Sequence, residues 1–179
     1  MERRILIAGI GNIFFGDDAF GVELAQQLNR RPVPEGVAVI DFGIRGIDLA
    51  YALLDDYAAA ILLDATPRGG APGTLYLIEP DADTLDGLGL AGVETHNVDP
   101  VKVLATVKAF GGRPPRFWIV GCEPTTFEAR DNNVVSLSAP VKAALPQAIE
   151  MVETLVARIL REVEEPSAAE ASVEAAADS

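Results

Sequence analysis

Cysteine and histidine are nearly absent from this sequence: of its 179 residues, one is cysteine and one is histidine. A single cysteine excludes an internal disulfide framework and any zinc or iron–sulfur site built from several thiolates. Basic residues are also scarce, since 14 of them face 27 acidic residues and the net charge is -13. Nucleic acids and anionic membranes attract basic surfaces, so we expect neither as a partner.

Long apolar stretches are absent as well. No run approaches the roughly 18 consecutive apolar residues that a membrane-spanning helix requires, and the apolar run near the N-terminus is too short for the hydrophobic region of a signal peptide. We therefore expect a cytoplasmic protein. The composition, with 49% apolar and 23% charged residues, is typical of a folded globular domain.

The last residues differ in composition from the rest of the chain. From Pro166 onward the sequence reads PSAAEASVEAAADS, which contains no basic residue and has Val173 as its one large aliphatic residue. Such a segment cannot bury enough apolar surface to fold. We expect a single α/β domain over residues 1–164 and a disordered acidic tail over residues 165–179.

Short runs of β-branched and aliphatic residues recur along the chain. Continuous apolar runs of this length are typical of strands covered on both faces by helices. Five such runs predict strands, at residues 5–8, 37–40, 58–63, 74–78 and 117–120. The turn before the fourth run is rich in Gly and Pro, which predicts a hairpin and one antiparallel edge strand. The pattern predicts an α/β fold, a three-layer sandwich around a mostly parallel twisted sheet.

Segments of helical period separate these runs. Phe20, Leu24 and Leu28 share one stripe of a helix over about 19–29, and a shorter helix is expected over 47–54. Asp99 is a candidate N-cap for a helix that begins at Pro100. The last helix is expected from about 138 to 161, with a buried stripe formed by Ile149, Val152, Leu155, Val156 and Ile159.

Acidic residues and the single histidine follow the predicted strands. In a doubly wound sheet, ligands bind at the carboxyl ends of the strands. Asp17 and Asp18 come after the first strand, Asp64 ends a central strand, and His96 lies in a later loop. If these two strands are neighbours, as in a 2-1-3 order, then Asp18, Asp64 and His96 meet at one edge. Two carboxylates and an imidazole suit Ni²⁺ or Zn²⁺ and leave coordination positions open.

Each of these residues also has a simpler interpretation. An aspartate before a helix serves as an N-cap worth about 1 kcal/mol, although one of the pair Asp17 and Asp18 suffices for that. A second carboxylate near the helix N-terminus is expected to be held ionised by the helix dipole, which is the state a metal ligand needs. Taken alone, Asp64 would accept hydrogen bonds from neighbouring loop amides, and His96 would be an ordinary loop histidine.

Two other kinds of site are compatible with some of these residues. Gly9, Gly11 and Gly16 follow a strand as in dinucleotide-binding proteins, but the GxGxxG pattern requires glycine where this chain has Phe14, and paired carboxylates would repel phosphate. Cys122 and His96, the one cysteine and the one histidine, would form a thiolate–imidazole pair. A cysteine that ends a buried strand is, however, more often a small core residue.

Six motifs in order resemble those of the hydrogenase maturation endopeptidases, and the resemblance as a whole runs from about residue 3 to 160. Each is weak alone, but six in register are hard to obtain by chance. They are Gly9-Ile10-Gly11-Asn12, Asp17-Asp18 with Gly21, Asp41-Phe42-Gly43-Ile44-Arg45-Gly46, Asp64-Ala65-Thr66, Thr95-His96-Asn97 and Gly121-Cys122-Glu123-Pro124.

The resemblance implies a protease that removes a short C-terminal extension from the large-subunit precursor of a [NiFe] hydrogenase after nickel insertion. The family's metal-binding and catalytic positions map onto Asp18, Asp64 and His96. Many members carry Glu where this chain has Asp18, so the shorter side chain requires a closer backbone. The nickel would come from the precursor, where it would serve for recognition, polarise the scissile carbonyl or activate a water.

The loop after the second predicted strand is a candidate substrate-binding segment. Gly43, Arg45 and Gly46 would accommodate the substrate chain, with Arg45 as a partner for a carboxylate. An ordinary surface turn with a solvated arginine is the alternative. For the whole protein, two other functions stay open at this point: a noncatalytic module that binds a nucleotide or a metal, and a zinc-dependent hydrolase of a small substrate.

Overall fold

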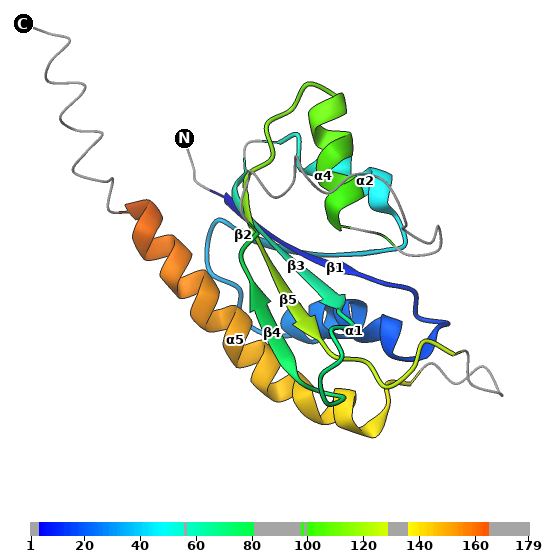
Figure 1. Ribbon diagram of the computed structural model, residues 1–179. Helices are drawn as coiled ribbons and strands as arrows, with labels where there is room; N and C mark the ends of the chain where they lie inside the picture. Colours follow the sequence, from blue (N-terminus) through cyan, green and yellow to red (C-terminus); the bar gives the residue numbers. More distant parts are fainter. Residues whose placement is uncertain (1–3, 56, 81–97, 99, 129–135, 165–179) are drawn as a thin grey trace, which may run out of the picture.

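The computed structural model of the protein describes residues 4–55, 57–80, 98, 100–128 and 136–164 (Figure 1). Helices and strands alternate along the chain, as the sequence predicts. The elements are β1 (Arg4–Ile10), the 3-10 helix η1 (Gly16–Ala19), α1 (Phe20–Leu28), β2 (Val37–Gly43), α2 (Gly46–Ala52), β3 (Tyr57–Ala65), β4 (Leu75–Ile78), α4 (Pro100–Ala109), β5 (Arg116–Cys122) and α5 (Ala139–Glu164).

The strands form one sheet in the order β2-β1-β3-β5-β4. Four strands run parallel, and β4 pairs antiparallel with β5 at one edge. The predicted mostly parallel sheet with one antiparallel edge strand is confirmed, as is the 2-1-3 order of the first three strands. The other edge of the sheet is β2.

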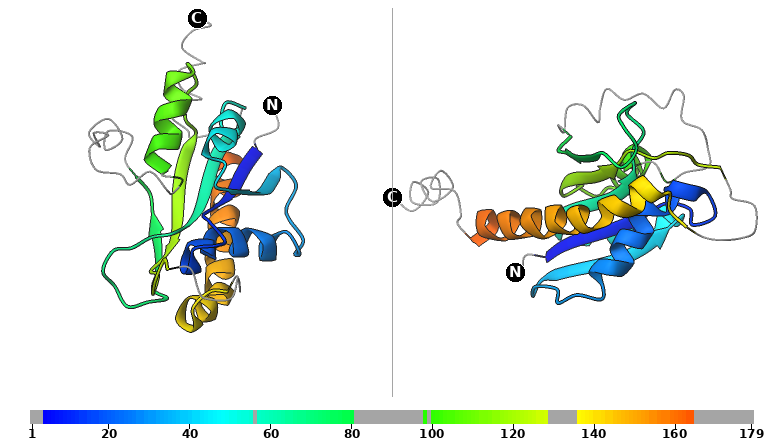
Figure 2. Two further views of the ribbon diagram at one scale, coloured as in Figure 1. Left: turned by 90° about the vertical axis from the view of Figure 1, so that its right-hand side faces the viewer. Right: turned by 90° about the horizontal axis from the view of Figure 1, so that it is seen from below.

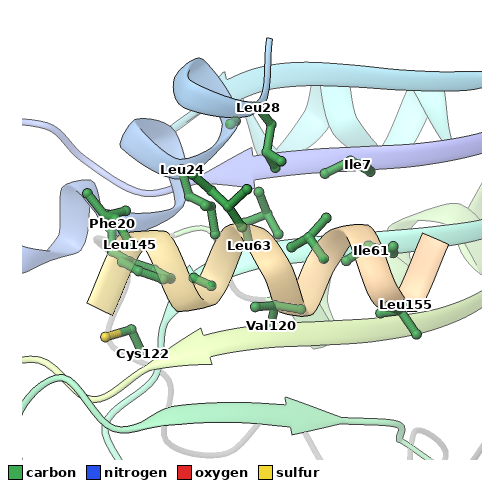
Figure 3. Close-up of a cluster of buried hydrophobic side chains, with 14 of the residues drawn as sticks. Ile7, Phe20, Leu24, Leu28, Ile61, Leu63, Val120, Cys122, Leu145 and Leu155 are labelled. Atoms are coloured by element: carbon green, nitrogen blue, oxygen red, sulfur yellow. The ribbon is translucent and has the colours of Figure 1, made fainter. Parts of the chain in front are cut away.

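Helices cover both faces of the sheet (Figure 2). Alternate residues of β1 point to opposite faces, because the side chains of a strand have a period of two. Ile5 and Ile7 pack with α1 and α5 in one buried cluster, whose side chains Figure 3 shows between α5 and the strands. Leu6 and Ala8 pack with α2 and α4 in a second cluster. Both faces being covered explains why the strands are continuous apolar runs.

The predicted helices are present with small shifts of their ends. The first is preceded by η1, so that the chain enters α1 through a tighter turn of 3-10 helix. The helix expected from Pro100 begins there, while its candidate cap Asp99 lies outside the described residues. All five residues of the predicted stripe on the last helix are buried in α5.

The predicted hairpin before β4 is wrong. β4 pairs with β5 and not with β3, so the segment between β3 and β4 crosses over the end of β5. Backbone hydrogen bonds hold this crossing, from Gly73 N to Glu123 O and from Glu123 N to Thr74 O, both at 2.8 Å. The Gly and Pro residues of the segment therefore form a connection around a strand rather than a tight turn between two partners.

α5 is described as far as Glu164, and the domain boundary predicted at this residue stays a prediction. The predicted tail, residues 165–179, lies outside the described residues. Among the helices that the structure describes, none combines the length and apolar character needed to cross a membrane.

Candidate active site

The carboxyl ends of β1, β3 and β5 lie side by side, because these strands are parallel neighbours. The start of α1 crosses this edge at very short range. A Cβ atom added to Gly21 would lie 2.0 Å from the carbonyl oxygen of Leu63 in β3 and 2.4 Å from that of Ile10 in β1. Only glycine allows this approach. As a result η1, which directly precedes α1, contacts β3 and carries Asp18 to the edge of the sheet.

Asp18 is buried, with 2% of its surface exposed. The backbone N–H of Asn12 donates a hydrogen bond to its Oδ2 at 2.6 Å, the one hydrogen bond to this carboxylate within the described residues. Burial raises the pKa of Asp18, and the hydrogen bond from Asn12 lowers it by less. Burial therefore has the largest effect on the pKa of Asp18, and the ionised state expected from the helix dipole stays a prediction. Neither aspartate of the pair acts as a side-chain N-cap of η1 or α1.

Asp17 points away from its neighbour, toward residues that lie far along the chain. Its carboxylate accepts hydrogen bonds from Ser138 N at 2.6 Å, Ser138 Oγ at 2.8 Å, Thr125 N at 2.7 Å and Thr126 N at 3.4 Å. Burial alone would raise the pKa of Asp17, but the hydrogen bonds together outweigh it, and the pKa is lowered. The two adjacent aspartates thus have different surroundings and different tasks.

Asp64 is half-buried near the end of β3, where it pairs in register with Gly121 of β5. Leu62 belongs to the buried cluster under α2 and α4, and the alternation of side chains along the strand directs Asp64 to the same face. Val98, which precedes α4, packs on that cluster too. The structure therefore brings Asp18 and Asp64 to one edge of the sheet, as predicted from the strand order.

His96 lies outside the described residues, so its predicted place beside Asp18 and Asp64 stays a prediction. Among the residues that are described, no three His, Cys, Asp or Glu side chains are gathered closely enough to hold a metal ion. Asp18 and Asp64 are among these described residues, and His96 is not.

A groove of about 370 Å³ lies between the loop after β1 and the end of β2. Asn12, which bonds Asp18, lines it together with Phe14, Gly43, Ile44 and Arg45. Two apolar side chains at the groove are strongly exposed, Phe14 at 65% and Ile44 at 62%. Exposed apolar side chains around a concave surface mark sites where a ligand or another chain binds.

Arg45 is exposed, and it also hydrogen-bonds its own loop. Its Nη2 donates to the carbonyl oxygen of Asp41 at 2.5 Å and its Nε to that of Phe42 at 3.1 Å, while Nη1 lies 3.7 Å from Asp48 Oδ2. Gly46 begins α2, where a Cβ would lie 3.2 Å from Val98 Cγ1. Of the three predicted substrate-binding residues, Gly43 and Arg45 line the groove.

Comparison with known proteins identifies the family. A sequence model described as hydrogenase maturation protease matches residues 22–155. The chain belongs to this family. It is 30% identical to the hydrogenase expression/formation protein HupD of Rhizobium leguminosarum, over 82% of this chain and 71% of that protein.

Solved structures agree with the family assignment. The hydrogenase maturating endopeptidase HybD of Escherichia coli superposes with a TM-score of 0.72 and 27% identity, covering 87% of this chain and 93% of that one. The hydrogenase 2 maturation peptidase of a Thaumarchaeota archaeon superposes with a TM-score of 0.66 and 31% identity, covering 87% and 99%. The chain is thus a peptidase with the fold of the hydrogenase maturation endopeptidases.

In this maturation protease the glycines that suggested a nucleotide site serve close packing. A Cβ on Gly9 would lie 2.5 Å from the carbonyl oxygen of Gly21, so Gly9 lets α1 approach β1. Gly11 N donates to Gly43 O at 3.0 Å, and the amide of Asn12 is bound to Asp18. These amides are engaged within the protein, whereas a phosphate-binding loop keeps them for the ligand.

Cys122 has the environment of a core residue. It is fully buried in the cluster under α1 and α5. Burial raises the pKa of its thiol to about 12, and the charges of Asp17 and Glu123 add to the effect. The thiol is therefore protonated at neutral pH, which makes it unsuitable as the nucleophile of the maturation protease.

Sequence reasoning gave no role to Glu123, which the structure shows as a second buried anchor. Its carboxylate accepts hydrogen bonds from Tyr76 Oη at 2.7 Å, Arg68 N at 2.8 Å and Gly69 N at 3.0 Å. The hydrogen bond from Tyr76 contributes most to lowering the pKa of Glu123. A signal was available, because an acidic residue directly after a buried strand requires partners, but nothing in the sequence says which loop supplies them.

Proposed function

We propose that this peptidase removes a C-terminal extension from the large-subunit precursor of a [NiFe] hydrogenase after nickel insertion. The nickel carried by the precursor binds Asp18, Asp64 and His96, and it therefore belongs to the substrate. This metal can polarise the scissile carbonyl or activate a water. The observation that supports the proposal most is the placement of Asp18 and Asp64 on adjoining elements at one edge of the sheet.

The surroundings of Asp18 suit a carboxylate that binds a cation. A buried carboxylate is costly unless its oxygens are satisfied. Asp17 receives four hydrogen bonds, whereas Asp18 receives one within the described residues. A divalent ion brought by the substrate supplies the missing partner. Precursor without nickel offers no such partner, so we expect it to bind poorly.

The groove beside Asp18 is the place that we assign to the substrate chain. Its exposed apolar side chains Phe14 and Ile44 provide contact area, and Gly43 leaves room for a backbone to approach. Arg45 shapes the loop through its hydrogen bonds to Asp41 and Phe42, and its exposed face is available to a carboxylate of the precursor.

Nickel dependence is tested with purified protein and precursor, loaded with nickel or free of it. The masses of the products are measured after incubation. We expect the C-terminal segment to be released from the loaded precursor alone. Equal cleavage of both forms would contradict the role of nickel in recognition.

The three proposed ligands are tested by Asp18→Asn, Asp64→Asn and His96→Ala, each expected to lower cleavage by about 100-fold or more because the metal is no longer held in position. Asp55→Asn is the matched control. Asp55 is exposed and lies just before β3, at the opposite edge of the sheet, and its substitution makes the same change of charge. A ligand variant that cleaves as well as this control removes that residue from the site.

Metal analysis of the isolated protein separates this function from a zinc-dependent hydrolase of a small substrate. We expect a protein that is active on nickel-loaded precursor without stoichiometric zinc. Stoichiometric zinc that is required for activity would favour the zinc enzyme.

A further inference from the structure

The two adjacent aspartates of η1 reach toward opposite parts of the protein. Asp18 is bonded to Asn12 in the loop after β1, while Asp17 is bonded to the loop after β5 and to Ser138, which directly precedes α5. The segment that carries Asp18 is therefore held from two sides. The hydrogen bond between Asn12 and Asp18 is local along the chain, whereas those of Asp17 join residues more than a hundred positions apart.

The hydrogen bonds of Asp17 engage its whole carboxylate. Both carboxylate oxygens are used, Oδ1 by Ser138 N and Oδ2 by Ser138 Oγ and Thr125 N, at 2.6, 2.8 and 2.7 Å. Because Ser138 Oγ donates its proton to Asp17, it accepts a hydrogen bond from Thr125 Oγ1 at 2.9 Å, and Asp17 N donates to Thr126 O at 3.1 Å. Asp17 is 1% exposed, so water does not compete for these hydrogen bonds.

The residues that donate hydrogen bonds to Asp17 lie beside well-packed parts of the fold. Ser138 leads into α5, whose first turns bury Val141 and Leu145 in the main cluster. The loop after β5 also lies directly on η1, since a Cβ on Gly16 would be 2.9 Å from the carbonyl oxygen of Thr126. Asp17 thus ties η1 to a helix that packs in the main buried cluster and to the loop after β5.

We propose that Asp17 is a positioning residue, which fixes the place of the Asp18 carboxylate by anchoring η1 to α5 and to the loop after β5. The inference rests on the proposed function, because it takes Asp18 as the carboxylate that meets the substrate's metal. Asp17 is not itself a ligand in this proposal, since its oxygens already accept hydrogen bonds from the protein.

Asp17→Asn tests the anchor with little change of volume. An amide has one oxygen, so its NH₂ group faces a donor of Ser138 or Thr125 and one side of the anchor opens. We expect kcat for nickel-loaded precursor to fall about 10- to 100-fold, because small misplacements of a reacting group have effects of that size. We expect KM to rise by less than kcat falls, since the rest of the groove is untouched.

A second readout follows Asp18 directly and needs no substrate. The amide of Asn12 donates to Asp18 Oδ2 at 2.6 Å, and so short a hydrogen bond to a carboxylate moves the amide proton resonance to high frequency. In a ¹H–¹⁵N correlation spectrum of Asp17→Asn, we expect this resonance to shift back toward ordinary values. Ser138→Ala, which removes one donor and keeps Ser138 N, is expected to give smaller changes in the same direction in both readouts.

Arg116→Gln controls for a general loss of stability. It breaks hydrogen bonds to Glu79 and Glu162 at the start of β5, at the opposite edge of the sheet. We expect its kcat and its Asn12 resonance to match those of the unaltered protein at temperatures where both are folded.

The outcomes separate this inference from the proposed function. An Asp17→Asn variant with unaltered kcat overturns the inference, and so does a fall in kcat with an unmoved Asn12 resonance. If Asp17→Asn does not fold, Ser138→Ala decides by the same two criteria. Nickel-independent cleavage by the unaltered protein overturns the proposed function, whatever the spectra show.

Discussion

Gly21→Ala tests the close approach of α1 to the sheet, on which the position of Asp18 depends. The added Cβ would lie 2.0 Å from Leu63 O, and side-chain carbons in proteins essentially never come closer than 3.0 Å to such an atom. The start of α1 must therefore move by about 1 Å, at an overpacking cost of about 1–3 kcal/mol in the free energy of unfolding. A displacement of 1 Å at a reacting group lowers kcat by about 100-fold.

Urea unfolding and the rate of precursor cleavage measure the two effects. Gly111→Ala is the matched control, because Gly111 has a φ of +79° and nothing within 4 Å of an added Cβ. That variant is strained but unobstructed, and we expect it to lose about 1–2 kcal/mol of stability with unaltered kcat. A Gly21→Ala protein with the stability and kcat of the unaltered protein would refute the close approach and the argument that the glycine positions Asp18.

Three further predictions follow from buried and exposed groups. The hydrogen bond from Tyr76 lowers the pKa of Glu123 below its ordinary 4.5, so the unfolded chain takes up a proton at this residue at a higher pH than the folded protein does. The free energy of unfolding, measured in urea, should therefore decrease between about pH 6 and pH 3. The decrease should be smaller in Glu123→Gln. The Cys122 thiol, with a pKa of about 12, should resist iodoacetamide at neutral pH, and Cys122→Ala should keep its cleavage rate. Phe14→Ser should raise KM for precursor about 5- to 10-fold without changing Tm, whereas Leu77→Ser, exposed on the edge strand β4, should leave KM unaltered.

Much of the fold follows from local patterns in the sequence. The buried runs of β1, β3 and β5 are apolar because both faces of the sheet are covered, so their strands are recognisable without partners. The stripe of α5 is recognisable from its spacing alone. The strand that pairs with β4 cannot be recognised from local patterns. The choice between β3 and β5 depends on a loop that crosses over the end of β5 and is held there by Glu123.

The division of tasks between Asp17 and Asp18 was beyond sequence reasoning for a similar reason. The residues are identical and adjacent, and their difference comes from donors at Thr125 and Ser138, far along the chain. The sequence did predict that Asp18 and Asp64 share one edge, because that follows from strand order. It did not show how deeply Asp18 is buried, because that burial is set by how closely Gly11 lets the backbone of η1 approach.

The hydrogen bonds at this edge of the sheet distinguish Asp18, the buried carboxylate that we propose as a metal ligand, from the other buried carboxylates. Asp17 and Glu123 are as buried as Asp18, but each accepts hydrogen bonds from several donors and stabilises the loops that surround the site. A carboxylate satisfied in this way gains little from a cation and would lose its hydrogen bonds by binding one. Asp18 has one such bond within the described part of the chain, so a cation offsets its desolvation without breaking an anchor. In the proposed function, a metal carried by the substrate completes the site at Asp18, while the hydrogen bonds of Asp17 and Glu123 hold the loops around it.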